Sequence, residues 1–288
     1  MASANGGRAN CFVSAAVFRP LSNPQALLGA LYENGHLIKA ASYRGATAKP
    51  AIDPPTVSQQ QINKALSIQG SCIYLGWLSN FFGHLLLEAP ARFWFLNSID
   101  VSKSRFIFHP LGDKANSKNI FQIELAQVLF NCFGIRKEQI IFADRDLFVE
   151  ELIIPSSLFF LNLTVDSSQY NIYKQLKIYL LKNQKTHSTA KKRIYLSKRL
   201  LKKSNVQSVD NEEKIEQIFR EYGFEIIFSE QLPLYQQVSL LSEAEIIAGC
   251  EGSALHLGVF MPLSSKMIIL SARGIAMNQV LINTLVTI

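Results

Sequence analysis

Apolar and polar positions along the chain form blocks that predict strands alternating with helices. In the first half, short apolar runs typical of buried strands occur at residues 71–77, 105–110, 139–143 and 151–155. Helical periodicity covers residues 118–133, and an Asn-Gly pair between two strand-like runs predicts a β-hairpin region at residues 27–43. Strands that alternate with helices are typical of a parallel sheet with crossover helices, so we expect an α/β domain here.

The second half of the chain restarts the same alternation. Strands are predicted at residues 193–197, 224–228, 245–252 and 266–271, with helices starting at Asp210 and covering 234–244 and 253–260. Asp210, with Glu213 three residues later, resembles a capping box, and Gly223 is typical of a helix stop. Residues 182–193 hold no large apolar side chain and predict a linker. We therefore expect two α/β domains, residues 1–185 and 186–288, the second a Rossmann-like β-α-β-α-β-α-β series.

Composition and charge narrow the class of protein. The chain is 48% hydrophobic and 18% charged, which suffices for a large core and argues against disorder. The net charge of +7 suggests an anionic partner: nucleic acid, an anionic membrane face or a phosphate-bearing small molecule. The 4 cysteines form no CxxC pair, which favours a reducing compartment. No apolar run reaches the roughly 18 residues of a membrane span, so we expect a soluble or peripheral protein.

The segment SNFFGHLLLEAPARFW, residues 79–94, places four polar residues in an otherwise apolar helix. Asn80, His84, Glu88 and Arg92 are spaced four apart, and a step of four turns the direction on an α-helix by only about 40°. Buried ionisable groups are costly unless paired, and both His84–Glu88 and Glu88–Arg92 have the spacing of a pair. The stripe is therefore either a paired structural network beside a wet crevice or part of an active site.

Two further segments suggest an anion site in the second half. In IAGCEGSALH, residues 247–256, a strand runs into Gly252 and then a helix, whose free N–H groups favour a phosphate. In IYLSKRLLKK, residues 194–203, Lys198 and Arg199 follow a strand end and could bind a diphosphate, although a solvated basic loop has the same composition.

Other polar positions carry no clear chemistry. The Asp144–Asp146 triplet formally matches the Asp-x-Asp pattern of metal-dependent sugar transferases, but its place between two short strands favours a surface turn. No cluster has metal-ligand spacing, and His36, His109 and His187 have no partner that the sequence shows.

Four motifs in this order resemble glycosyltransferase family 61, which includes bacterial capsule and surface-polysaccharide proteins. They are the N-x-x-x-H-x-x-x-E-x-x-x-R-like segment NFFGHLLLEAPAR (80–92), the strand end YLSKR (195–199) with the helix start DNEE (210–213), the block GFEIIFSEQLPLYQQ (223–237), and the turn GCEGSALH (249–256). The likeness covers residues 71–97 and 193–270.

The resemblance implies a GT-B-like fold, with two Rossmann-like α/β domains facing a cleft, and an inverting, metal-independent sugar transfer. The nucleotide sugar, expected to be a UDP-sugar, would bind the second domain, and the acceptor side would lie in the first. The residues that this assignment implicates are His84 as base and Glu88 as its orienting partner (catalytic), Asn80 and Arg92 (acceptor side), and Lys198, Arg199, Glu230, Gln237, Glu251, Gly252 and Ser253 (donor side). No cofactor and no metal are expected.

Departures from the family pattern keep other functions open. Glu251 stands where the family usually has His, His256 where Asn often follows, and Lys198 where Arg often follows the Ser. A role resting on that turn histidine cannot be carried over, so a catalytically inactive member that binds nucleotide is an alternative. A polyanion-binding protein using the basic residues 191–203, with nucleic acid or anionic membrane as its partner, is another. For the transferase we expect a glycan or lipid-linked acceptor, no nucleic acid, and a cytoplasmic location with peripheral contact at the inner face of the membrane.

Overall fold

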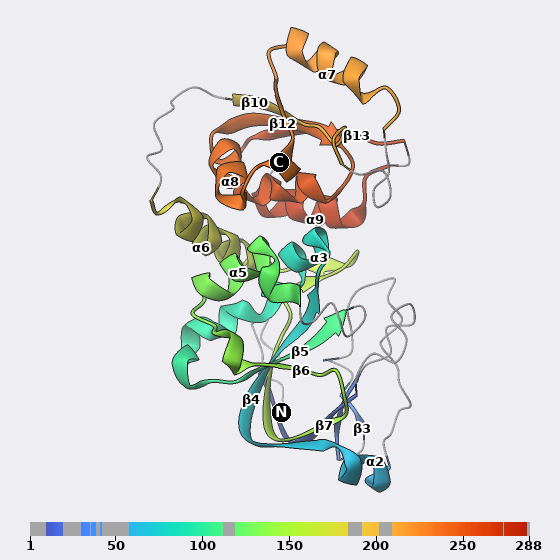
Figure 1. Cartoon of the computed structure of the whole chain (residues 1–288), viewed down its shortest axis with the longest axis vertical. Coiled ribbons are helices and arrows are strands. Elements are labelled where there is room, and N and C mark those ends of the chain that lie inside the picture. The colour runs from blue at the N-terminus through green and yellow to red at the C-terminus, as the bar shows by residue number, and fades with distance from the viewer. Residues whose placement is uncertain are drawn as a thin grey trace. The chain divides into compact units, whose positions relative to one another are not determined.

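A computed structural model of the chain describes residues 10–19, 30–34, 36–38, 41, 58–111, 119–183, 192–201, 209–272 and 274–286. The chain divides into two compact units, Met1–Gln169 and Tyr170–Ile288 (Figure 1). The sequence placed this boundary in the linker at residues 185/186, most of which lies outside the described residues. In the structure, helix α6 (Gln169–Leu181) belongs almost wholly to the second unit.

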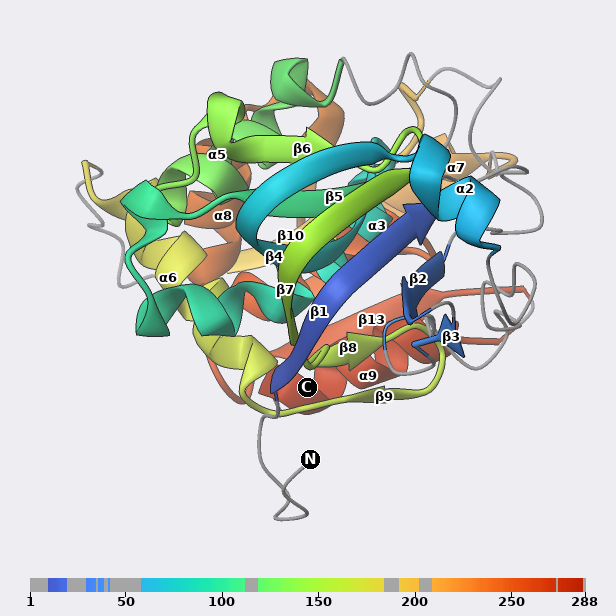
Figure 2. The same ribbon diagram turned by 90° about the horizontal axis from the view of Figure 1, so that it is seen from below.

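Unit 1 is built on a seven-stranded mixed sheet of order β3-β2-β1-β7-β4-β5-β6, whose central strands lie side by side in Figure 2. Strands β7, β4, β5 and β6 run parallel, while β1, β2 and β3 pair antiparallel. The strands are β1 (Asn10–Arg19), β2 (Ala30–Glu33), β3 (His36–Leu37), β4 (Leu66–Ser79), β5 (Phe106–Leu111), β6 (Ile140–Phe142) and β7 (Leu147–Pro155), with a separate β8–β9 pair (Phe159–Phe160 and Thr164–Val165). The predicted α/β class with parallel strands is confirmed.

The helices of unit 1 are α2 (Gln59–Lys64), α3 (Phe82–Leu87) and α5 (Glu124–Cys132), with 3-10 helices η1 (Ala89–Ser98), η2 (Val101–Lys103), η3 (Ile120–Gln122) and η4 (Lys137–Gln139). Helix α2 precedes β4, and the other helices lie in the connections from β4 to β5 and from β5 to β6. Helix α2 begins at a complete capping box, in which Ser58 and Gln61 bond each other's backbone N–H groups. The sequence predicted one helix over 118–133, and the structure has η3 followed by α5.

The N-terminal region differs most from the sequence analysis. The apolar run at residues 11–18 was not predicted to be a strand, yet β1 pairs with β7 along its length from Asn10 to Phe18. The predicted hairpin is confirmed, because Glu33 pairs with His36 across the turn and Asn34 takes a positive φ of 50°. The loop predicted at residues 44–58 lies almost wholly outside the described residues.

Strand β4 is the central strand that leads into the polar segment. Its last eight residues, 72–79, are all buried, as expected for a parallel strand covered on both faces. The pairing of β4 with β5 shifts register between Tyr74 and Gly76, and Gly76 takes a φ of +96°. A Cβ at Gly76 would lie 2.9 Å from Nη1 of Arg92, so the glycine makes room for a buried guanidinium.

Unit 2 is built on a four-stranded, all-parallel sheet of order β11-β10-β12-β13. The strands are β10 (Lys192–Leu196), β11 (Glu225–Ile227), β12 (Ala244–Cys250) and β13 (Lys266–Leu270), and the helices are α6, α7 (Glu212–Glu221), α8 (Leu234–Ser242) and α9 (Met277–Val286), with 3-10 helices η5 (Ser229–Gln231) and η6 (Ser253–Phe260). The predicted strand–helix series is confirmed, except that the segment after β12 is a 3-10 helix. Strand β11, which follows β10 in the chain, lies on one side of β10, and β12 lies on the other side. The order of the strands therefore reverses between β10 and β12. Ligands of open α/β sheets bind at such a switch point, outside the carboxyl ends of the strands.

The predicted capping box of α7 does not form. Asn211 is the N-cap residue, has a positive φ of 59°, and makes no side-chain cap bond. The helix ends as predicted, with Gly223 at a φ of +79°. Among the described residues, no helix has both the length and the apolar character needed to cross a membrane.

Candidate functional site

The carboxyl end of β4 presents a histidine–glutamate pair. His84 and Glu88 lie one turn apart at the end of α3, and Nδ1 of His84 is 2.7 Å from Oε2 of Glu88. The Glu88 side chain is 5% exposed and the His84 side chain 41%. A buried carboxylate at this distance favours the tautomer with hydrogen on Nδ1, which puts the ring lone pair on Nε2. The predicted i,i+4 pair is thereby confirmed.

Arg92 does not continue the predicted stripe. The chain changes from α-helix to 3-10 helix at Glu88, with Pro90 in the first turn of η1. Residues four apart no longer share a face at three residues per turn. Arg92 instead donates from Nε to the carbonyl of Pro155 at 2.9 Å and packs over the Tyr74 ring. Burial lowers the pKa of Arg92, while Tyr74 and Glu88 act to raise it.

The arginine assigned to the acceptor side is therefore part of the core of unit 1. Arg92 is 4% exposed, and contact with an acceptor would require rearrangement. Unit 1 also holds a buried histidine for which the sequence analysis found no partner. Nδ1 of His109 is 2.9 Å from the Tyr74 hydroxyl, and Trp77 stacks on the His109 ring. The sequence shows only a single His within the predicted strand at residues 105–110, and this pattern does not indicate which residue it contacts.

Asn80 and Phe81 lie between β4 and α3. Oδ1 of Asn80 is shielded from solvent and has no hydrogen-bond partner among the described residues. Phe81 was expected to be buried with the rest of the segment, but it is 66% exposed. Its ring contacts that of His84, with 6.4 Å between the centroids. The exposed part of this segment thus carries an aromatic ring beside an imidazole.

In unit 2, Lys198 connects the turns that follow β10 and β12. Its ammonium donates to the backbone carbonyl of Glu251 and lies in the space beside Gly252, where a Cβ would come within 2.5 Å of Nζ. Gly252 has a φ of +155°. Burial lowers the pKa of Lys198, and Cys250 and Glu212 act in the opposite direction. A cation is thus positioned at the switch point of the sheet, at the turn that holds Gly252.

Arg199 is held by a buried carboxylate on α7. Nε of Arg199 is 2.8 Å from Oε1 of Glu216, whose other oxygen accepts from Arg220 at 3.1 Å. Ser197 donates to the same carboxylate at 2.8 Å. The hydrogen bond that Arg199 donates to Glu216 raises the pKa of Arg199. The sequence analysis missed Glu216, and because of it Arg199 is not the unengaged phosphate ligand that was expected.

The side chain of Glu251 hydrogen-bonds two residues that follow β13. Its Oε2 accepts from the Ser271 hydroxyl at 2.7 Å and its Oε1 from the Ala276 amide at 2.6 Å. The carboxylate that the sequence assigned to the donor therefore holds Ser271 and Ala276. Ser253, also assigned to the donor, is exposed at the start of η6.

The sequence analysis also did not identify a second buried carboxylate on α7, that of Glu212. Glu212 is buried, and Oε1 accepts from the Lys198 amide at 3.0 Å and from the Tyr195 hydroxyl at 3.2 Å. The same Tyr195 hydroxyl lies 3.6 Å from Sγ of Cys250. Burial raises the pKa of both Tyr195 and Cys250. Glu212 and Glu216 lie one turn apart, and together they hold the three-residue turn after β10.

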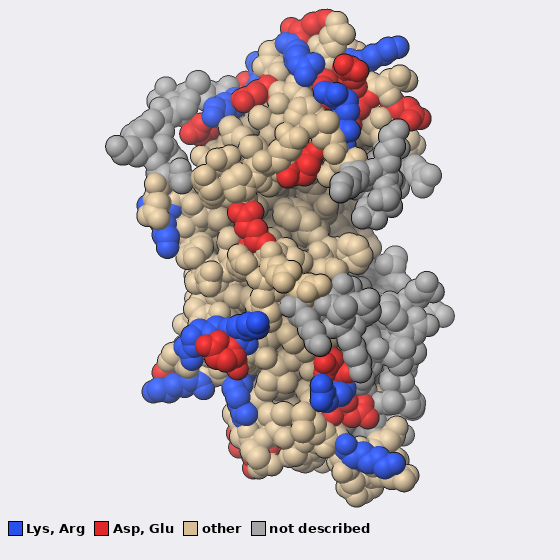
Figure 3. Space-filling view, viewed as in Figure 1, with Lys and Arg blue, Asp and Glu red and all other residues tan. Residues whose placement is uncertain are grey.

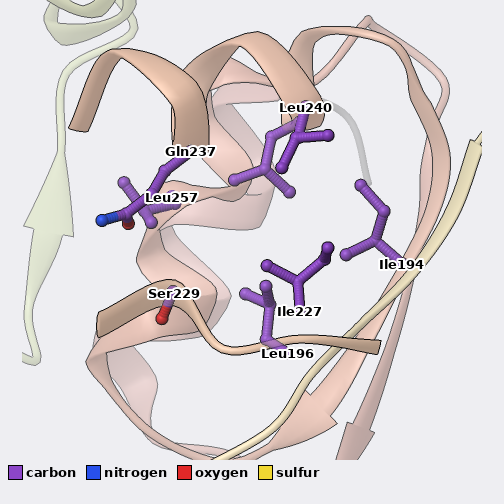
Figure 4. Close-up of a pocket in the computed structure, with 8 residues that line it drawn as sticks. Ile194, Leu196, Ile227, Ser229, Gln237, Leu240 and Leu257 are labelled. Carbon is purple, nitrogen blue, oxygen red and sulfur yellow. The ribbon is translucent and has the colours of Figure 1, made fainter. Parts of the chain in front are cut away.

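Glu230 and Gln237 lie away from this turn. Glu230 is exposed in η5, and Gln237 donates to the Leu232 carbonyl at 2.8 Å. Gln237 borders a pocket in which aliphatic side chains point toward one another, with the polar ends of Gln237 and Ser229 to one side (Figure 4). Its free volume of about 10 Å³ is at the lower limit for one water molecule. This pocket is part of the core of unit 2 and does not hold a nucleotide.

Two further features of the protein are the charged side chains on its surface and the side chains of the types that bind metal ions. Among the described residues on the face shown in Figure 3, Lys and Arg side chains are interspersed with Asp and Glu side chains, and the predicted basic stretch at residues 191–203 is only partly among the described residues. Asp144 and Arg145 pair with each other at 3.1 Å in the turn between β6 and β7. Within the described ranges, no group of three His, Cys, Asp or Glu side chains could hold a metal ion.

Each unit thus brings together part of the predicted site. In unit 1, a carboxylate-held imidazole can accept a proton. In unit 2, a lysine at a glycine turn can neutralise an anion, and two buried carboxylates hold the backbone that carries it. The two parts have the chemistry of a general base and of a leaving-group stabiliser.

Comparisons with known proteins place the chain in a family. A family model described as glycosyltransferase 61 matches residues 82–268, which is more than half of the chain. No curated protein matches the chain. Among solved structures, one similar chain is the bacterial iron-containing dodecameric glycosyltransferase TibC from enterotoxigenic E. coli H10407, at 14% identity and a TM-score of 0.32, covering 94% of this chain and 76% of that one. The family model decides the assignment: the chain belongs to glycosyltransferase family 61.

Proposed function

We propose that this glycosyltransferase is an inverting, metal-independent enzyme that moves a sugar from a nucleotide-sugar donor to a hydroxyl of a glycan or lipid-linked acceptor. The observation that carries the proposal is the His84–Glu88 pair, in which a buried carboxylate holds a partly exposed imidazole at 2.7 Å. In this proposal the two units form a GT-B-like pair of domains, with the acceptor side in unit 1 and the donor side in unit 2. Surface-polysaccharide synthesis at the inner face of the membrane is the setting that the family resemblance favours.

The proposed reaction is a single displacement. The acceptor hydroxyl oxygen forms a bond to the anomeric carbon, and the bond from that carbon to the phosphate oxygen breaks. Nε2 of His84 takes the hydroxyl proton, and Glu88 stabilises the imidazolium that results. The nucleotide leaves with the electron pair of the broken bond. Inversion follows because the hydroxyl attacks from the face opposite the leaving phosphate.

Lys198 is the proposed partner of the leaving phosphate. Its ammonium already fills the space beside Gly252, so an anion that binds at the turn after β12 would meet this charge. Arg199 has its charge engaged by Glu216 and contributes less. Glu251 and Ser253 shape the site from the turn after β12, and Glu251 does so by holding Ser271 and Ala276.

A melting-temperature screen tests the donor side. The purified protein is heated with UDP, GDP, CMP, dTDP and their sugar conjugates, with and without EDTA. A ligand that binds only the folded state raises the melting temperature, by an amount equivalent to about 2.7 kcal/mol at a hundredfold excess over Kd. We expect one nucleotide, UDP by family resemblance, to give a shift that EDTA does not change.

Two variants separate the roles of the neighbouring cations. Lys198→Ala is expected to lose most of the nucleotide shift, because no other described cation lies at Gly252. Arg199→Ala is the matched control and should keep a larger part of the shift, although its unliganded protein melts lower through loss of the Glu216 pair. An equal loss in both variants would contradict the special role of Lys198, and no shift in folded wild-type protein would remove the donor site.

A further inference from the structure

Glu212 is a buried carboxylate whose hydrogen-bond donors are uncharged. It is the first residue of α7 and 3% exposed. Its Oε1 accepts from the Lys198 amide at 3.0 Å and from the Tyr195 hydroxyl at 3.2 Å, and neither of these described donors carries a charge. The first turn of a helix favours an acid, but a buried carboxylate also needs a counter-charge. A negative charge beside an anion site, moreover, opposes binding unless a cation balances it.

The next carboxylate on the same helix has such a counter-charge. Glu216 is fully buried and forms ion pairs with Arg199 at 2.8 Å and with Arg220 at 3.1 Å. Glu212, one turn earlier, instead contacts the backbone of a residue whose side chain is a cation. Burial lowers the pKa of Lys198, and the charges of Cys250, Glu212 and Glu251 act to raise it. The charge of Glu212 therefore acts on Lys198.

Of the three groups that act on the Lys198 ammonium, Glu212 has the strongest claim at neutral pH. Burial raises the pKa of Cys250 above its ordinary 9.0, so this thiol is uncharged near pH 7. Glu251 is partly exposed, and each of its oxygens accepts a hydrogen bond from a residue after β13. Glu212 is buried, and it also holds the Lys198 backbone. It thus fixes the place of the lysine and acts on its charge.

We propose that Glu212 is a positioning residue of the donor side. Through a backbone hydrogen bond it holds the turn that carries Lys198, and through its charge it keeps the Lys198 ammonium protonated for the leaving phosphate. The ammonium itself donates to the Glu251 carbonyl, so its charge is not cancelled by a direct ion pair with Glu212. This inference rests on the proposed function, because it assigns the charge of Lys198 to the diphosphate of that reaction.

An NMR titration of the protein labelled with carbon-13 at lysine Cε tests the inference without a ligand. The Lys198 signal is identified by its loss in Lys198→Met. Glu212→Gln keeps an oxygen acceptor for both donors but has no charge. Lys198 should therefore lose its proton about one pH unit lower in this variant than in wild type, the lower end of the effect of an opposite charge nearby. Glu213→Gln, which removes an exposed acid from the same turn of α7, should leave the Lys198 titration unchanged.

The reciprocal titration decides the question even if Glu212→Gln does not fold. The interaction between two charges acts equally on both partners, so the Glu212 carboxylate should take up its proton at a higher pH in Lys198→Met than in wild type. Carbon-13 at glutamate Cδ follows this titration, and loss of the signal in Glu212→Asp identifies it. An unchanged titration of Lys198 in folded Glu212→Gln, or of Glu212 in Lys198→Met, would overturn the inference.

The nucleotide-induced melting shift separates this inference from the proposed function. The affinity of Glu212→Gln for UDP, relative to wild type, should fall by up to about tenfold as the pH rises from about 6 to about 10, because the variant loses the ammonium charge first. A ratio that stays constant with pH, while wild type binds UDP, would contradict the role of Glu212. No shift with UDP or any other nucleotide in folded wild type would contradict the proposed function, and the two NMR titrations would still decide whether Glu212 holds the charge of Lys198.

Discussion

Replacing His84 with alanine is expected to lower the rate of sugar transfer by about 100- to 10,000-fold, the usual contribution of a positioned general base. The variant loses the imidazole that Glu88 holds at 2.7 Å, and with it the group that takes the acceptor proton in the proposed reaction. The nucleotide-induced melting shift should be unchanged, because donor binding is assigned to unit 2. Turnover is measured as nucleotide released from the donor that the melting screen identifies.

Two companion variants distinguish a catalytic from a structural role for His84. Glu88→Gln keeps the shape but removes the charge that orients the ring, and should cost about 10- to 100-fold, as the outer partners of functional histidines do. His84→Gln, which can still hydrogen-bond Glu88, should be as inactive as His84→Ala while melting closer to wild type. Full transfer by His84→Ala with normal donor affinity would show that the base is another residue.

Replacing Glu216 with glutamine is expected to destabilise the fold more than any of the His84, Glu88, Lys198 or Arg199 substitutions. Glu216 is 0% exposed and accepts from Ser197, Arg199 and Arg220. Removing one partner of a buried pair costs about 3–5 kcal/mol, and because both arginines are partly exposed we expect the lower end, about 3 kcal/mol. Both tryptophans, Trp77 and Trp94, lie in unit 1, so circular dichroism and hydrogen exchange of the β10 and α7 peptides are the measurements that follow unit 2.

Glu216→Gln should also reduce the dependence of the free energy of unfolding on pH in the acidic range. Burial raises the pKa of Glu216, but hydrogen bonds from Arg199 and Ser197 and the charge of Arg199 outweigh it, so the net pKa lies below its ordinary 4.5. A carboxylate with a lowered pKa stabilises the fold above the ordinary pKa, and this stability is lost as the pH falls through the folded pKa. The gap between wild type and Glu216→Gln should therefore shrink below pH 4.5. Glu221→Gln, which removes an exposed acid on the same helix, is the control, and its free energy of unfolding should lie within about 0.5 kcal/mol of the wild-type value.

The parts of the fold that could be predicted are those set by local patterns. The turns after β10 and β12 could be placed together because parallel strands end at the same edge of a sheet, and the His84–Glu88 pair follows from helical spacing alone. Strand β1 escaped prediction because its apolar run is short and its partner β7 lies more than a hundred residues away along the chain. Such pairing leaves no local signal.

The errors at the candidate site have one physical origin. Arg92 was expected to continue the polar stripe of α3, but after the change to 3-10 helix at Glu88 its Nε donates to the Pro155 carbonyl, while the charge of Glu88 still acts to raise its pKa. Arg199 was expected to be available because only its neighbours in sequence were visible. Its partner Glu216 is on a helix 17 residues away, and the packing of α7 against β10 brings the two together. Side-chain partners across elements depend on packing that a single sequence does not reveal.

The measurement that tests the central claim most directly is release of nucleotide from a panel of nucleotide sugars in the presence of EDTA. The full chain is incubated with each donor and a membrane extract containing lipid-linked glycans, and wild type is compared with His84→Ala. The account predicts that one donor is consumed, that EDTA leaves the rate unchanged, and that His84→Ala lowers the rate of consumption at least about 100-fold. Consumption only when a divalent metal is present, or an unchanged rate in His84→Ala, would contradict it.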